Sequence, residues 1–220
     1  MNVQAVIFDI DGTLVDSNEQ HVTAWAFAFR EAGYPQEVED IRRQIGKGGD
    51  QLLPALLPDV AEPIRNRIAD SHGRYFKDMY LNHVHSFEGA TELVAKVHAS
   101  GRRVALASSA KRDEIEHYVE LLGIGDYLAA TTSIDDVDAS KPAPDIFGVA
   151  LEKIGLSGEQ AIVVGDTPYD VEAALKAGVA AVGVTSGPFD ALRLKEAGAV
   201  AVYSNVGELL DAFDRSPLAE

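Results

Sequence analysis

Two aspartates, separated by one residue, follow the first apolar run of the sequence. Residues 3–8 predict a buried strand, and Asp9 and Asp11 come directly after it. Because ligands gather at the carboxyl ends of strands in open α/β sheets, charge at this point favours a reactive site. Asp9 is a candidate nucleophile or metal ligand, and Asp11 is a candidate acid/base. The alternative is a turn that uses Asp and Gly for their conformational preference alone.

A pair of hydroxyls and a lysine occupy corresponding places later in the sequence. Ser108 and Ser109 follow the expected strand 104–107, where hydroxyl and backbone N–H groups suit a phosphate oxygen. The alternative is a serine that caps the next helix. Lys141 lies just before a helix, in a loop that Pro142 and Pro144 restrict. A lysine held in this way can neutralise a phosphoryl group, whereas the simpler alternative is a solvated loop lysine.

A second group of carboxylates repeats the pattern of the first strand. The apolar run 161–164 is followed by Gly165 and Asp166, and Asp170 comes shortly afterwards, at the start of the next expected helix. If both runs belong to one parallel sheet, their carboxyl ends meet at the same edge. The carboxylates of the two runs are therefore candidates for a single site.

The elements that must position these residues alternate between helix and strand from residue 87 onward. The pattern predicts strands over residues 104–107, 127–132, 161–164, 180–184 and 200–203. It predicts helices over residues 89–100, 113–122, 145–154, 169–177, 188–197 and 206–214. Such alternation is typical of a parallel sheet covered by helices on both faces, and the first strand must belong to the same sheet.

A helical section interrupts this α/β pattern. Residues 18–32 carry apolar side chains at helical spacing, and the same spacing recurs between residues 35 and 86, where strand-like runs are missing. We therefore expect a doubly wound α/β core, residues 1–15 and 87–220, with an all-helical domain inserted over residues 16–86. The sequence shows no internal repeat.

The ordered set of motifs resembles a known family. Asp-x-Asp-Gly-Thr, then Ser, then Lys-Pro, then Gly-Asp-x-x-x-Asp each follow a predicted strand or its loop. The set resembles the four signatures of the haloacid dehalogenase-like superfamily, most of whose members are phosphatases, and it covers essentially the whole chain. The helical insertion resembles the cap of the phosphoglycolate phosphatase and β-phosphoglucomutase branch. The resemblance implies a Rossmann-like core.

The resemblance also implies a role for each motif residue. Asp9 would form an aspartyl phosphate, and Asp11 would protonate the leaving alcohol and then deprotonate water. We expect neighbouring carboxylates to favour the protonated form of Asp11 when no metal is bound. Residues expected to hold the phosphate are Gly12, Ser108, Ser109 and Lys141. Residues expected to hold Mg²⁺, the ion that hard oxygen ligands and a phosphate favour, are Asp9, Asp11 (through its backbone carbonyl), Asp166 and Asp170.

Three cap residues are weaker candidates for substrate contacts. In the resembling branch, a loop like Gly46–Gly49 faces the active site, which makes Arg43 and Lys47 candidates, with solvated side chains as the alternative. His21 stands at a position that resembles a histidine of the β-phosphoglucomutase branch. It either lines the site or lies on the surface.

Composition limits the partners. The chain has 220 residues, 46% of them hydrophobic, and a formal net charge of −16, which argues against nucleic acid and anionic membranes as partners. An acidic protein needs a local cation to bind phosphate. The absence of cysteine excludes disulfides and thiol chemistry, and no apolar run approaches membrane-spanning length, so we expect a cytoplasmic protein. Nothing in the sequence predicts an oligomeric state.

The sequence therefore favours Mg²⁺-dependent hydrolysis of a small phosphomonoester, a phosphorylated metabolite. A phosphomutase would use the same chemistry, but its branch has Glu-Asp where this chain has Gly165 and Asp166. A dehalogenase needs no metal, and the presence of Asp11 and Asp166 argues against it. A non-catalytic protein on the same fold should have lost Asp9 or Lys141, and this chain has both.

Overall fold

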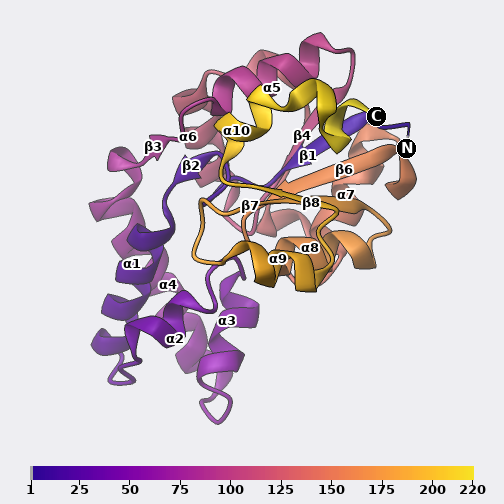
Figure 1. Cartoon of the computed structure of the whole chain (residues 1–220). Helices are drawn as coiled ribbons and strands as arrows, with labels where there is room; N and C mark the ends of the chain where they lie inside the picture. The colour runs from indigo at the N-terminus through magenta and orange to yellow at the C-terminus, as the bar shows by residue number, and fades with distance from the viewer. Residues whose placement is uncertain (1) are drawn as a thin grey trace.

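The computed structural model describes residues 2–220 and contains a six-stranded parallel sheet (Figure 1). Its strands are β1 (Ala5–Phe8), β4 (Arg103–Ala107), β5 (Leu128–Thr132), β6 (Ala161–Gly165), β7 (Ala180–Val184) and β8 (Ala201–Tyr203). They lie in the order β5-β4-β1-β6-β7-β8, so β1 is central and pairs in parallel with β4 and β6. The chain runs outward from β1 in both directions. This reversal leaves a crevice at the carboxyl end of β1, where ligands bind in open α/β sheets.

Helices cover both faces of the sheet, as the alternating sequence pattern predicts. On one face lie α5 (Ala90–Ala99), α6 (Arg112–Leu122) and α10 (Val206–Asp211), and on the other lie α7 (Asp145–Ile154), α8 (Pro168–Lys176) and α9 (Ala191–Ala197) (Figure 1). Alternate residues of β1 serve the two layers. Val6 and Phe8 pack into the first apolar cluster, whereas Ala5 and Ile7 pack into the second.

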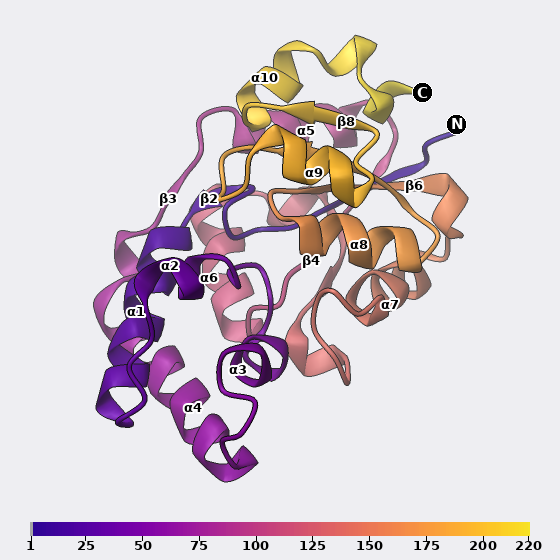
Figure 2. The same cartoon turned by 60° about the horizontal axis from the view of Figure 1, so that its bottom comes forward.

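The inserted section forms a helical cap with an apolar core of its own. It contains α1 (Asn18–Glu31), α2 (Val38–Arg42), α3 (Gly49–Leu56) and α4 (Glu62–Met79), which lie together at one end of the molecule (Figures 1 and 2). Trp25, Phe29, Ile41, Leu52 and Ile68 are buried in a cluster separate from the two clusters of the sheet. This separate core accounts for the change of periodicity in the sequence, because the cap helices bury their apolar faces against one another.

The structure differs from the sequence prediction at a few boundaries. A short antiparallel ribbon, β2 (Val15–Asp16) with β3 (His85–Ser86), joins cap and core where no strand was expected, because two residues are too short for a periodic signal. Helix α9 begins later than predicted, since Asp190 caps it by accepting from the N–H of Arg193. Within residues 2–220, the structure contains no helix long and apolar enough to cross a membrane.

Candidate active site

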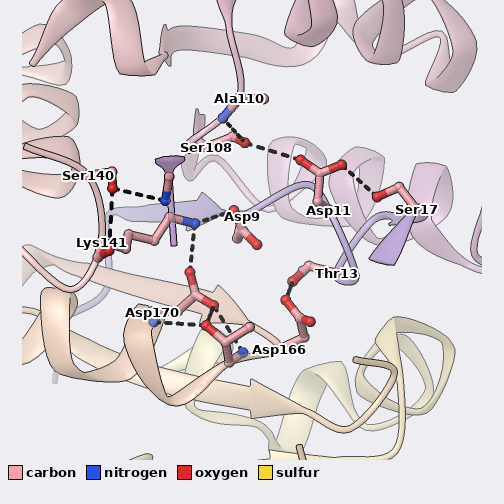
Figure 3. A network of polar contacts seen from close by, with 12 residues as sticks. Asp9, Asp11, Thr13, Ser17, Ser108, Ala110, Ser140, Lys141, Asp166 and Asp170 are labelled. Carbon is pink, nitrogen blue, oxygen red and sulfur yellow. Dashed lines mark hydrogen bonds and ion pairs between the residues drawn. The ribbon is translucent and has the colours of Figure 1, made fainter. Parts of the chain in front are cut away.

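Carboxylates from two neighbouring strands meet in the crevice beyond the sheet (Figure 3). Asp9 follows β1 and Asp166 follows β6, and both side chains are buried. Carboxylate oxygens of Asp9, Asp166 and Asp170 lie within 4.8 Å of one another. The pairing of β1 with β6 brings these residues together, as the two matching sequence patterns predicted.

Neutral donors fix two of these carboxylates from outside the cluster. The Thr13 hydroxyl donates to Asp166 at 3.1 Å, and the Asn18 amide donates to its other oxygen at 2.9 Å. Asp170 lies in a capping box at the start of α8, where its carboxylate accepts from the backbone N–H and the hydroxyl of Thr167 at 3.0 and 2.6 Å. These bonds hold oxygens of both carboxylates in set directions.

A buried lysine completes the cluster. The Lys141 ammonium donates to Asp9 and, at 2.7 Å, to Asp170 (Figure 3). Burial opposes the charged form of this lysine, but the two carboxylates outweigh burial and raise its pKa. Lys141 therefore stays a cation inside the site and is not the solvated loop lysine of the alternative interpretation.

The charge balance of the cluster fits a divalent cation. Ionised Asp9, Asp166 and Asp170 with one Lys141 ammonium carry three negative charges and one positive charge, which leaves two negative charges. Burial raises the pKa of Asp9 to about 7 against the opposing effect of Lys141, and burial raises that of Asp166 well above its usual value. The carboxylates thus lack compensation for their charge, and hard oxygen donors of this kind suit Mg²⁺.

Asp11 faces away from the carboxylate cluster. Its side chain accepts from Ser17 at 2.6 Å and from Ser108 at 3.4 Å (Figure 3). It also contacts the imidazole of His21 at 3.2 Å. The expectation that neighbouring carboxylates keep Asp11 protonated is wrong in this structure. Burial acts in that direction, but contacts with His21 and Ser17 outweigh it and lower the pKa of Asp11 to about 2.

His21 brings a second histidine to the site. Its Nδ1 lies 3.2 Å from Nε2 of His72 on α4, and its ring stacks on Phe76. His72 stacks on Trp25, and burial lowers its pKa well below the usual value, so its imidazole is neutral. The sequence left open whether His21 lines the site or lies on the surface. In the structure, His21 lines the cavity. No sequence pattern pointed to His72, because its role depends on a contact between two cap helices.

The loop after β4 offers hydroxyls to the same crevice. Ser108 is buried and its Oγ accepts from the N–H of Ala110 at 3.0 Å. The Ser109 hydroxyl is buried with no hydrogen-bond partner among the residues that the structure describes, and Ser109 lines the central cavity. An unpaired buried hydroxyl facing a cavity is available to a ligand.

Gly12 cannot be replaced without disturbing the cluster. Its φ of +76° lies in the left-handed region, and a Cβ at this position would lie 2.1 Å from the Asn18 amide nitrogen and 2.2 Å from an Asp166 oxygen. The glycine therefore lets the first loop pass close to the carboxylates. Its carbonyl accepts from the Ser186 hydroxyl at 2.7 Å.

A cavity of about 240 Å³ lies between this site and the cap. Lys47 lines the cavity, and its ammonium lies 4.5 Å from the centre of the Tyr169 ring and donates to Gln44 at 2.6 Å. Arg43 does not line the cavity. Its side chain is 62% exposed and pairs with Asp40 at 3.1 Å. The structure thus separates two cap residues that the sequence left equivalent.

Comparisons with known proteins agree with this arrangement. Residues 6–184 match the family model of haloacid dehalogenase-like hydrolases. The phosphoglycolate phosphatase of Vibrio cholerae is 27% identical over 96% of each chain, and pyrophosphatase PpaX of Halalkalibacterium halodurans is 28% identical over 81% of this chain and 82% of its own. The crystal structure of a hydrolase from Pseudomonas syringae, 30% identical, gives a TM-score of 0.90 and covers 96% of this chain and 98% of that one. The chain therefore belongs to the haloacid dehalogenase-like hydrolases.

Proposed function

We propose that the protein is a Mg²⁺-dependent phosphatase that hydrolyses a small phosphomonoester through an aspartyl phosphate on Asp9. The observation that carries this proposal is the buried carboxylate of Asp9, which contacts the Lys141 ammonium and lies close to Asp166 and Asp170, at the edge of a cavity between the core and the cap. The names of the relatives, phosphoglycolate phosphatase and pyrophosphatase, support chemistry on phosphate groups. The cavity size supports a phosphorylated metabolite as substrate.

In the first step, an Asp9 oxygen attacks phosphorus and the bond from phosphorus to the leaving oxygen breaks. Lys141 and the hydroxyls of Ser108 and Ser109 hold the transferring oxygens, which carry the developing charge. Bound Mg²⁺ supplies a local positive charge that offsets the repulsion between carboxylates and a phosphate dianion. Asp9, Asp166 and Asp170, with the backbone carbonyl of Asp11, would hold this ion.

Asp11 is placed to move the proton. It must give a proton to the departing alkoxide and later take one from the water that attacks the aspartyl phosphate, which releases free phosphate and restores Asp9. With its pKa lowered to about 2, Asp11 is ionised before the substrate binds and is a weak base, so its pKa must rise for either task. A phosphate dianion entering beside Asp11 disfavours its charged form and so raises its pKa for the first, acidic task.

The cap, which we place over residues 16–86, would close over the substrate and exclude water during transfer. A mutase is the second candidate, and one observation argues against it. A Cβ at Gly165 would lie 2.5 Å from Cβ of Asp170. The glutamate that the mutase branch has at this position would therefore displace Asp170, which supports a hydrolase.

The test uses a generic aryl phosphate. We expect turnover that requires Mg²⁺, is lost in EDTA and returns when Mg²⁺ is added back, with inhibition by Ca²⁺, whose coordination shell is larger and more variable. Asp9→Asn should fold normally and retain less than about a tenth of the rate, since an amide cannot act as the nucleophile. Asp126→Asn, which changes an exposed aspartate, is the control. Full activity in EDTA, or an active Asp9→Asn variant, would refute the mechanism.

A further inference from the structure

The cap and the loop that carries Lys141 are joined by two hydrogen bonds. The Asp50 carboxylate, in the first turn of α3, accepts from the backbone N–H of Ser140 at 3.0 Å. In the second bond the cap is the donor, because the Ser140 hydroxyl accepts from the backbone N–H of Gly48 at 2.9 Å. Both bonds cross from cap to core and end on the residue directly before Lys141.

The cap loop at Gly48 and the core loop at Ser140 pack closely against one another. A Cβ at Gly48 would lie 2.7 Å from Oγ and 2.8 Å from Cβ of Ser140, so no side chain fits between them. Ser140 is fully buried, whereas Asp50 is exposed and also accepts from the Gln51 amide at 3.1 Å. With Gly48 and Asp50 withdrawn, the Ser140 N–H and hydroxyl would lose these partners.

The position of Ser140 bears directly on the reacting groups. The Ser140 hydroxyl also reaches the carbonyl of Lys141 at 3.4 Å, and the Lys141 ammonium contacts Asp9 and Asp170 (Figure 3). A displacement of the Ser140 backbone moves the origin of the lysine side chain. Small displacements of a group that touches the transferring atoms lower rates strongly, because transition-state contacts depend on geometry.

We propose that Asp50 is a positioning residue that couples closure of the cap to placement of Lys141. When the cap is closed, the Asp50 carboxylate fixes the Ser140 N–H and, through it, the lysine that holds the transferring phosphoryl group. When the cap opens, this bond breaks and the lysine loop is released. The inference rests on the proposed role of Lys141 in phosphoryl transfer.

A purely mechanical clasp makes different predictions. If Asp50 only held the cap down, its loss would weaken retention of substrate and raise KM, with the chemical step unchanged. If Asp50 positions Lys141, its loss lowers kcat and weakens binding of a transition-state analogue even for a small substrate. Orthovanadate is a suitable probe, because it takes the trigonal bipyramidal geometry of phosphoryl transfer.

The experiment compares Asp50→Ala, Asp50→Asn and Asp59→Ala with the wild type. Asn keeps a carbonyl oxygen that can accept from Ser140, whereas Ala does not. Asp59 is an exposed cap aspartate with no ion pair among the residues that the structure describes, which makes it a matched control. Steady-state kinetics on an aryl phosphate with Mg²⁺ and the inhibition constant of orthovanadate are measured for each variant. Circular dichroism checks the fold.

We expect Asp50→Ala to lower kcat about tenfold or more, with little change in KM, and to weaken orthovanadate inhibition by a similar factor. Asp50→Asn should recover most of both losses, and Asp59→Ala should match the wild type. Wild-type kcat and vanadate inhibition in Asp50→Ala, a change confined to KM, or equal damage in Asp50→Asn would each overturn the proposal while leaving the phosphatase function in place. An inactive wild type would refute the proposed function itself and this inference with it.

Discussion

Replacement of Lys141 with methionine removes a buried cation and keeps most of the side-chain volume. Lys141 is 1% exposed, and its partners Asp9 and Asp170 are 3% and 0% exposed. Breaking a buried ion pair by removing one partner costs about 3–5 kcal/mol, because the other charge stays buried without compensation. In a chain of this length, 1 kcal/mol corresponds to about 2–4 °C in Tm. We therefore expect Lys141→Met to lower Tm by about 6–20 °C when metal is absent.

The loss should depend on pH in a definite direction. Burial already raises the pKa of Asp9 in the folded state to about 7, well above its unfolded value, and removal of the lysine raises it further. A group with a raised folded pKa binds more protons in the folded state, so stability falls as pH rises through that range. At pH 5 Asp9 is protonated in both proteins, and the difference in Tm between variant and wild type should shrink.

The assay is thermal unfolding in EDTA at pH 5 and pH 8, for the wild type, Lys141→Met and the exposed-lysine control Lys195→Met. The double variant Asp9→Asn/Lys141→Met should lose less stability than the two single losses combined, since the unpaired carboxylate is gone. A drop in Tm below about 2 °C at pH 8, less than 1 kcal/mol, would refute the reasoning. So would a drop of the same size at both pH values.

Three further predictions concern the cap and the reaction outcome. Lys47→Ala should raise KM for the natural substrate about tenfold while Arg43→Ala changes it little, because only Lys47 lines the cavity; equal effects in steady-state kinetics would contradict this. His21→Gln should raise the pKa of Asp11 by about one unit or more, measured by carboxyl ¹³C NMR, since the contact with His21 lowers it. Incubation with β-glucose 1-phosphate, Mg²⁺ and a bisphosphate primer should give free phosphate in ³¹P NMR, and rapid formation of glucose 6-phosphate would show a mutase instead.

The core of the fold followed from the sequence because buried parallel strands leave continuous apolar runs between turn signals. The predicted run 161–164 differs from β6 (Ala161–Gly165) by one residue, and the run 180–184 coincides with β7. The ribbon of β2 and β3 left no such run. Its strands are far apart in sequence and take their pairing from the junction of cap and core, which no local pattern records.

The site also contains residues whose positions could be predicted from the sequence and others whose positions could not. The carboxylates of Asp9 and Asp166 were predictable because each follows its own strand, and parallel pairing brings strand ends together. The contact between Asp50 and Ser140 joins residues 90 positions apart in the chain, and that between His21 and His72 joins residues 51 apart. Such contacts depend on how the cap packs on the core and within itself. The expectation of a protonated Asp11 is wrong for the same reason, because the surroundings of Asp11 include His21 from the cap as well as residues of the motif.

The two aspartates of the first motif illustrate how environment assigns role. Asp9 is buried and Asp11 is half-buried beyond the end of β1. Burial raises the pKa of Asp9 to about 7, while contacts with His21 and Ser17 outweigh burial at Asp11 and lower its pKa to about 2. Pairs of carboxylates with pKa values pushed apart are typical of divided chemical roles. In the proposed mechanism ionised Asp9 is the nucleophile, and the carboxylates of Asp166 and Asp170 close to it would hold the cation that offsets its charge. Asp11, the proposed acid/base, owes its lowered pKa to its contacts with His21 on the first cap helix and with Ser17. In that mechanism the cap would act on proton transfer as well as on the choice of substrate.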